Sequence, residues 1–177
     1  MKSELTFSTT KSEIKLPSGK SYIAKVICNP TSSRTAKENY TILFSNAYGN
    51  REYNKIGIRK GGKIIKKFTG ERSPKRNPWF LAAGEERKSG LSIWRKALAK
   101  FKDSLDENVM IQASREVGDY MVSAYKRHVS EGKGIDGPLP RGSDKYEARK
   151  LKKWGNKPVL VASGQLLESL DKKTEVK

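Results

Sequence analysis

The chain has 177 residues, enough for one ordinary domain, with 35% hydrophobic and 32% charged residues. Its 37 Lys and Arg against 19 Asp and Glu give a formal net charge of +18, which predicts attraction to nucleic acid, an anionic membrane or an acidic protein surface. The single cysteine, Cys28, excludes an intrachain disulfide, and no apolar segment reaches the length of a signal peptide or a membrane span. We therefore expect a soluble protein with a modest core, made in the cytoplasm.

Residues 1–70 have the composition and alternation of β-structure. Two stretches that partly alternate between apolar and polar residues, 4–16 and 21–29, flank a "PSGK" turn. After a polar loop, residues 39–45 ("NYTILFS") are a further strand candidate. Residues 53–70 predict a hairpin around Gly61-Gly62, because isoleucines lie on both sides of this pair: Ile56, Ile58, Ile64 and Ile65.

The apolar period changes after the two prolines of "ERSPKRNPWFL", and residues 85–130 are expected to be helical. A first apolar stripe has spacings of three and four: Leu91, Trp94, Leu98, Phe101 and Leu105. A second stripe follows a shift at residues 106–108: Val109, Ala113, Val117, Met121, Ala124 and His128. The shift indicates either two helices with an N-cap near Asp106, which we favour, or one long helix whose buried face rotates.

Residues 131–177 begin with a break rich in Gly and Pro, followed by "DKYEARKLKKW", a short basic helix or an extended arm. Pro158 excludes a helix and starts an extended run, in which Val159, Leu160 and Val161 are expected to form a short buried strand. Ser163 is a candidate N-cap for "GQLLESL", and Gly164 permits a tight entry. We expect this strand–turn–helix, with Leu166, Leu167 and Leu170 on its apolar face, to complete the core of a single α+β domain over residues 1–177.

The titratable residues indicate no catalytic or metal site. His128 ends an apolar helical stripe, where a histidine is usually a helix C-terminal cation or a packing residue. Cys28 is expected to be a small buried hydrophobe. Asp136, Asp144 and Glu147 lie among lysines and arginines, which favours surface ion pairs over a metal cage. The Gly-rich "RKGGK" and "GKGIDG" are typical of turns, and we expect no enzymatic activity and no cofactor.

Two basic segments are the candidate interaction sites. Residues 51–102 hold sixteen Lys and Arg against four Asp and Glu, and a second cluster runs from Arg141 to Lys153. Aromatic residues lie among both clusters, as in proteins that bind single strands, although Trp94 fits the core and a solvated basic face is an equal alternative. The candidate contacts to DNA or to a neighbouring ring of subunits are Arg59, Lys60, Lys63, Lys66, Lys67, Lys145, Arg149, Lys150, Lys152 and Lys153.

The second half of the chain carries a recognisable succession of motifs. A helix ending near "YKRHVSEG" is followed by Pro138-Leu139, by the basic "YEARKLKKWGNK" and by "PVLVASGQLLESL". This succession resembles the tail-completion and virion-morphogenesis proteins of tailed bacteriophages, the Mu-type family and its siphophage head–tail joining relatives. The matching positions lie within residues 108–170: Pro138, Leu139, Lys145, Arg149, Lys150, Pro158, Leu160, Ser163, Gly164, Leu166, Ser169 and Leu170.

A second similarity lies upstream, in "KRNPWFLAAGEE". Pro78, Trp79 and Phe80 are similar to the family's "RPFL" element, which precedes its other helix. In the family this element follows the "TGxL" stretch, whereas here it comes first, as if the chain were circularly permuted. Ser163 stands in place of the usual Thr, and Asp136-Gly137 stand where the family has a Trp.

The resemblance implies a structural protein of the phage neck or proximal tail, which completes the tail and joins it to the head. It implies a homo-oligomeric ring, a hexamer by family analogy, with neck and tail proteins as partners, DNA in the channel as a further candidate, and no membrane. The virion would be its final location. The alternative is a basic nucleic-acid-binding protein, which explains the charge but leaves the C-terminal motif without a role.

Overall fold

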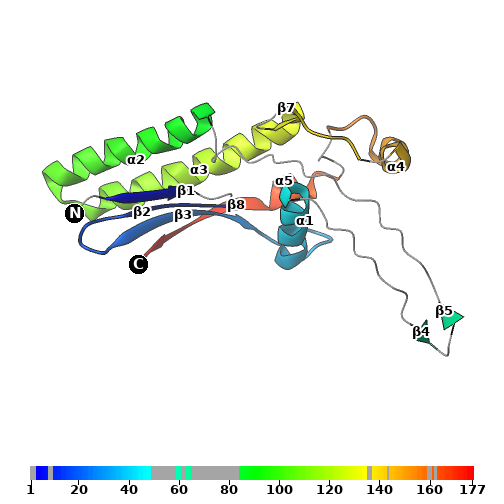
Figure 1. The fold of residues 1–177 in the computed structure, drawn as a ribbon, viewed down its shortest axis with the longest axis horizontal. Coiled ribbons are helices and arrows are strands. Elements are labelled where there is room, and N and C mark those ends of the chain that lie inside the picture. Colours follow the sequence, from blue (N-terminus) through cyan, green and yellow to red (C-terminus); the bar gives the residue numbers. More distant parts are fainter. Residues whose placement is uncertain are drawn as a thin grey trace.

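The fold has the α+β layout expected from the sequence, as seen in a computed structural model. The structure describes residues 3–7, 10–48, 59–60, 63–64, 84–134, 137–142, 144–158, 161 and 163–177. A four-stranded antiparallel sheet has the order β1-β2-β3-β8, and long helices cover one of its faces (Figure 1). Its strands are β1 (Glu4–Phe7), β2 (Lys11–Lys15), β3 (Ser21–Cys28) and β8 (Leu170–Val176).

The first three strands form a meander, as their alternation predicts. The "PSGK" turn between β2 and β3 is confirmed, because the Gly19 amide donates to the Leu16 carbonyl at 2.9 Å and Gly19 has a φ of 90°. Ile14 of β2 pairs with Tyr22 of β3, and both are buried in the core beneath the helices. Alternate residues face the opposite side of the sheet, where Lys25 is ion-paired with Glu175 and Ile23 is fully buried.

The final strand, β8, is the main departure from the sequence analysis, which assigned no element to "DKKTEVK". Seven residues of β8 pair with β3, from Tyr22↔Val176 to Cys28↔Leu170. Beyond them, Ser21 and Lys177 exchange two backbone hydrogen bonds of 2.8 and 2.9 Å. Gly118, in the helix that packs over β8, allows the strand to come close. A Cβ atom on Gly118 would lie only 3.0 Å from the Cβ of Lys172.

After helix α5 (Gln165–Ser169) the chain continues into β8, an element that the predicted strand–turn–helix did not include. Val161 lies in no strand, and its amide donates to the Pro158 carbonyl at 2.9 Å, while Val159 and Leu160 fall outside the described residues. The predicted Ser163 cap is wrong: α5 has Gly164 at its N-cap, with a φ of 82° and no side-chain cap bond. Gly164 thus makes the tight entry expected of it.

Residues 39–45 are helical, so their assignment to a strand is wrong. Helix α1 (Ala36–Tyr48) starts after Thr35, whose amide donates to the Glu38 carboxylate at 2.8 Å. The Glu38 amide donates in return to the Thr35 hydroxyl at 3.3 Å, which completes a capping box. Leu43 of α1 is fully buried, and Asn39 donates from its side chain to the Asn29 carbonyl. This local cap and the burial outweigh the β-branched and aromatic composition.

The two long helices confirm the predicted break. Helix α2 (Gly84–Ser104) and helix α3 (Glu107–Glu131) are separated by Leu105, with a φ of 53°, and by Asp106. The Asp106 carboxylate accepts from the Asn108 amide at 2.9 Å and is the N-cap of α3. The helices pack along each other, and α3 also lies on β3 and β8.

Trp94 of α2 is fully buried, as expected for a core residue. Its indole nitrogen donates to the buried Ser12 hydroxyl of β2 at 2.9 Å, which connects the outer helix to the sheet. Tyr22, Val117 and Met121 belong to the same hydrophobic core. Among the described helices, none combines the length and apolar character that a membrane crossing requires.

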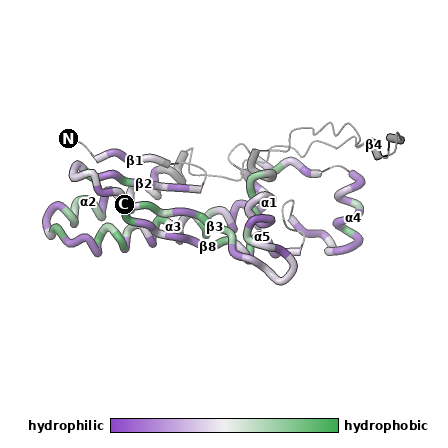
Figure 2. Tube along the Cα trace, turned by 90° about the horizontal axis from the view of Figure 1, so that it is seen from below, coloured by the Kyte–Doolittle hydropathy of each residue, from purple (hydrophilic) through white to green (hydrophobic). Residues whose placement is uncertain are grey.

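The remaining elements are short. Helix α4 (Asp144–Trp154) shows that the basic segment is a helix rather than an extended arm, and Figure 2 colours it mostly hydrophilic. Two small pairs of strands complete the described chain: β4 (Arg59–Lys60) with β5 (Lys63–Ile64), and β6 (Lys133–Gly134) with β7 (Gly137–Pro138).

Truncation after Ala162 tests the importance of the C-terminal segment. The shortened chain loses α5 and β8, exposes the edge of β3 and removes the buried Leu166 and Leu170, so we expect no cooperative unfolding transition in thermal circular dichroism. Deletion of Lys177 alone is the control and removes two terminal hydrogen bonds worth about 1 kcal/mol each. A cooperative transition in the long truncation contradicts the expectation.

Candidate functional site

Lys150 of α4 does not belong to the interaction surface proposed from the sequence. Its side chain is 2% exposed, and its ammonium donates to the carbonyls of Lys157 and Pro158 at 2.8 and 2.6 Å. Glu147 lies 4.0 Å from the ammonium and also accepts from the Gly142 amide at 3.1 Å. Lys150 therefore fixes α4 to the segment that leads into Pro158, and its charge is not available to a partner.

The other candidate cations of α4 are exposed. They are Lys145, Arg149, Lys152 and Lys153. Arg149 donates to the Lys145 carbonyl at 3.4 Å, and the Lys153 ammonium lies 4.7 Å from the centroid of the Trp154 ring. Two large apolar side chains lie beside these charges, Leu151 at 60% exposure and Tyr146 at 38%. Helix α4 thus combines cations with apolar groups that a partner could bury.

The hairpin predicted around Gly61-Gly62 is confirmed for the backbone pairs Arg59↔Ile64 and Lys60↔Lys63. Several residues named from the sequence lie outside the described residues: Ile56, Ile58, Ile65, Lys66, Lys67, Pro78, Trp79, Phe80 and Asp136. Of the motif residues that are described, Leu139 is buried and Pro138 is exposed in β7. Leu166 is buried under α1 and β3, where Gln165 accepts from the Ser33 hydroxyl at 2.8 Å.

Five lysines on and around the sheet are paired with carboxylates. Lys25 lies 2.5 Å from Glu175, and Lys173 lies 3.3 Å from the same carboxylate. Hydrogen bonds from these two lysines lower the pKa of Glu175. The same arrangement occurs in Lys11 with Glu13, Lys20 with Glu107 and Lys172 with Asp119. Much of the positive charge on this side of the molecule is therefore neutralised locally.

The outward face of α2 carries a set of cations that the sequence analysis did not single out. They are Lys88, Arg95, Lys96, Lys100 and Lys102, and all five are exposed. They belong to the basic region 51–102, but their common face is defined only once the apolar stripe of α2 is placed against the core. The sequence feature that could have revealed this face is the spacing of seven residues between Lys88, Arg95 and Lys102.

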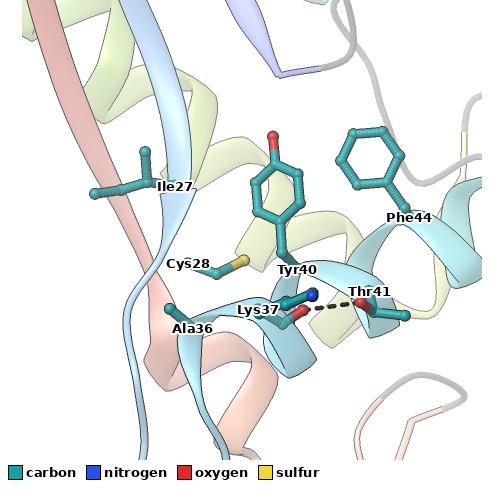
Figure 3. A pocket seen from close by; sticks show the side chains of 7 residues that line it. All are labelled: Ile27, Cys28, Ala36, Lys37, Tyr40, Thr41 and Phe44. Atoms are coloured by element: carbon teal, nitrogen blue, oxygen red, sulfur yellow. Dashed lines mark hydrogen bonds between the residues drawn. The ribbon is translucent and has the colours of Figure 1, made fainter.

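A hollow of roughly 650 Å³ lies between α1 and the end of β3 (Figure 3). Ile27 and Cys28 line it from β3, and Tyr40, Thr41 and Phe44 line it from α1. The rings of Tyr40 and Phe44 have centroids 4.9 Å apart, and the Thr41 hydroxyl donates to the Lys37 carbonyl at 2.8 Å. The lining is mainly apolar and could accept an apolar or aromatic group.

Cys28 and His128 occupy structural positions. Cys28 is 7% exposed, and burial raises the pKa of its thiol, while a hydrogen bond with Ser169 acts in the opposite direction. His128 is partly buried in the last turn of α3. Across the described residues, no group of three or more His, Cys, Asp and Glu side chains could hold a metal ion.

Comparison with models of protein families, with curated proteins and with solved structures finds no match to this chain.

Substitution of Lys150 tests its role in positioning α4. Lys150→Met leaves two carbonyls without their donor, so we expect a loss of about 1 to 3 kcal/mol in the free energy of unfolding measured in urea. Limited proteolysis near residues 155–158 should become faster. The exposed Lys152→Met is the matched control, with an expected change under about 0.5 kcal/mol. Equal effects of the two substitutions contradict the assignment.

The reactivity of Cys28 with iodoacetamide tests the packing beside the hollow. Because burial raises the thiol pKa, less thiolate is present at neutral pH, and the native chain should react far more slowly than the chain in denaturant. A Cys28→Ala chain carrying Ser163→Cys is the control, since residue 163 is exposed and should react at the rate of a free thiol. Similar native rates at both positions would show that the hollow admits the reagent.

Proposed function

We propose that this chain is a structural protein of the neck or proximal tail of a tailed bacteriophage, where it completes the tail and joins it to the head. It acts as a ring of identical subunits around the DNA channel, a hexamer by analogy with the family that its motifs resemble. This proposal rests on the motif resemblance, and three features of the fold support it.

The observation that most supports the proposal is that the helices next to the two motif stretches in the sequence pack against each other. Helix α2 begins at Gly84, immediately after "KRNPWFLAA", and α3 leads into Pro138-Leu139 and the basic segment. The two helices pack along each other over the sheet. Two helices that adjoin the motifs in an exchanged order along the chain thus contribute to one core, as expected of a permuted relative.

The positions of the chain ends also fit a permuted order. Glu4 pairs with Lys15, Lys15 pairs with Ser21, and Ser21 is hydrogen-bonded to Lys177. These four residues lie in one row across the sheet. The start of β1 and the end of the chain after β8 are therefore three strand spacings apart, about 14 Å at about 4.8 Å each. Both ends lie at one end of the molecule in Figures 1 and 2. Nearby ends are the condition under which permutation preserves a fold.

Helix α4 is the surface that best suits a neighbouring protein in such an assembly. It lies at the end of the molecule opposite the chain ends (Figures 1 and 2). Protein interfaces gain most of their stability from apolar and aromatic anchors that become buried, and Leu151 and Tyr146 provide candidates beside the cations. We therefore propose that α4 binds an acidic surface of an adjacent neck or tail protein.

The test is to locate the chain in particles and to disrupt α4. The wild-type chain should copurify with mature particles and occupy a ring at the head–tail junction in electron cryomicroscopy. Leu151→Asp should leave heads and tails unjoined without changing the stability of the isolated chain, because Leu151 is exposed. Leu105→Asp, at 74% exposure away from α4, is the control. Absence of the chain from purified particles contradicts the proposal.

The alternative function is a basic nucleic-acid-binding protein that acts outside the virion. The exposed cations of α2 and α4 favour it, since they match phosphate rather than a defined small ligand. The two functions differ in location, because the alternative predicts no copy of the chain in particles.

A further inference from the structure

We propose that the outward face of α2 is a nucleic-acid-binding face that contacts the phosphate backbone. We refer to the five residues Lys88, Arg95, Lys96, Lys100 and Lys102 as the α2 cationic face. This inference goes beyond the proposed function and does not depend on ring formation, because it concerns the isolated chain.

The α2 cationic face is rigidly positioned by the core. On the opposite side of the helix, Trp94 and Ala97 are buried, and Trp94 is hydrogen-bonded to Ser12 of the sheet. Lys88, Arg95 and Lys102 are seven residues apart and therefore lie almost in line, with about 10 Å between neighbours at about 1.5 Å of rise per residue. Lys96 and Lys100 lie further round the exposed side of the helix, roughly 100° and 140° from Arg95 at about 100° per residue. The cations are thus held along one side of a helix about 30 Å long.

The charge of this face is not neutralised by the described part of the chain. From residue 88 to residue 104, five cations face one acid, Asp103. None of the five forms an ion pair with another described residue, whereas Lys11, Lys20, Lys25, Lys172 and Lys173 all do. Cations without a carboxylate partner attract the phosphates of a nucleic acid. Binding releases the counterions that are condensed on those phosphates, and this release is the main source of affinity.

The groups between the cations favour nucleic acid over a protein partner. Ser92 and Ala99 occupy the spaces along the line, and both are small and exposed. Of the large exposed hydrophobic residues of the described chain, only Leu105 adjoins this face, just beyond its C-terminal end. The others lie elsewhere: Tyr40, Tyr146, Leu151 and Val176. A protein interface needs such anchors, and lysine is depleted in its centre. Phosphate contacts need only exposed cations with room for the backbone to approach.

The length of the face suits several phosphates. Lys88 and Lys102 are about 21 Å apart along the helix axis, and phosphates of one DNA strand repeat every ~3.4 Å along the duplex axis. This length equals the axial rise of about six phosphates, and the three aligned cations, about 10 Å apart, can each reach a different one. Contacts of this kind carry no base specificity, so we expect binding to duplexes irrespective of sequence.

The test compares two matched triple variants of the full chain by fluorescence anisotropy with a labelled random-sequence duplex over a range of salt concentrations. Lys88→Gln with Arg95→Gln and Lys102→Gln alters the α2 cationic face. Lys145→Gln with Arg149→Gln and Lys152→Gln is the control, since it removes two exposed lysines and one exposed arginine from α4 and changes the net charge equally. The α2 triple should weaken binding and lower the slope of log K against log salt by about 2 to 3.

The control triple should leave most of the slope in place. Equal loss in both variants overturns the inference, because it indicates a response to net charge alone. A larger loss in the α4 triple, or no binding by the wild type, overturns it as well. Glutamine has nearly the helix propensity of lysine and arginine, and circular dichroism of both variants checks that the helices remain.

Acetylation of the unaltered chain gives a second measurement that does not depend on variants. Addition of the duplex should protect Lys88, Lys96 and Lys102 from acetylation more strongly than Lys145 and Lys152. Polyglutamate of equal charge serves as a competitor. If it protects the same lysines as strongly as the duplex does, the face recognises an acidic polypeptide and the assignment to nucleic acid fails. A failure of the chain to bind the duplex would not count against the ring proposal. Absence of the chain from particles would not count against duplex binding.

Discussion

The pairing of β3 with β8 is the interaction on which the rest of the structure depends. It joins residues 150 positions apart along the chain, as in Lys25 with Glu175, and it places the end of the chain beside the first strands. Helix α3 packs over both strands, so the platform for the helical layer exists only once β8 has joined. The same pairing positions α5, because Leu170 is buried directly at the start of β8 and the Asn29 amide donates to the Ser169 carbonyl at 2.7 Å.

Charge is distributed unevenly around this core. Near the sheet, lysines lie within a few ångströms of carboxylates, and such exposed pairs contribute little to stability but cancel the local field. On α2 and α4, the exposed cations have no such partners among the described residues. Among the described elements, α2 and α4 therefore carry exposed positive charge that no described carboxylate neutralises. The α2 cationic face lacks apolar anchors, whereas α4 has Leu151 and Tyr146, so the two basic helices suit different classes of partner.

Periodicity predicted the parts of the fold that have one buried face. The stripes of α2 and α3, the break at Asp106 and the strands β2 and β3 all follow from residue spacing because one side of each element is in the core. The strand β8 was not predicted because it lacks an apolar alternation. Its solvent side carries Asp171, Lys173 and Glu175, and on the other side Lys172 packs on α3 through its aliphatic stem. Only the tertiary pairing with β3 makes this charged segment a strand.

Two other features needed information that composition does not contain. Helix α1 begins at a capping box formed by Thr35 and Glu38, a short local signal that strand-like residues further along obscured. Lys150 resembled its exposed neighbours in sequence, yet its ammonium is buried because carbonyls that follow α4 turn back towards it. Leu166 of the motif could be placed in the core from the sequence, but the strand that follows it could not be predicted.

Native-state hydrogen exchange of β8 tests most directly whether the β3–β8 pairing holds the fold together. Ser21 and Lys177 form a hydrogen-bonded pair, so the alternation of antiparallel ladders places Ile23 with Glu175 and Lys25 with Lys173 in the same class. The amides of Lys173 and Glu175 should exchange only through global unfolding, with the same free energy as amides in the centre of α3. Exchange of β8 through a smaller opening, while α2 and α3 stay protected, would show that the helical layer does not need β8 and would contradict this account.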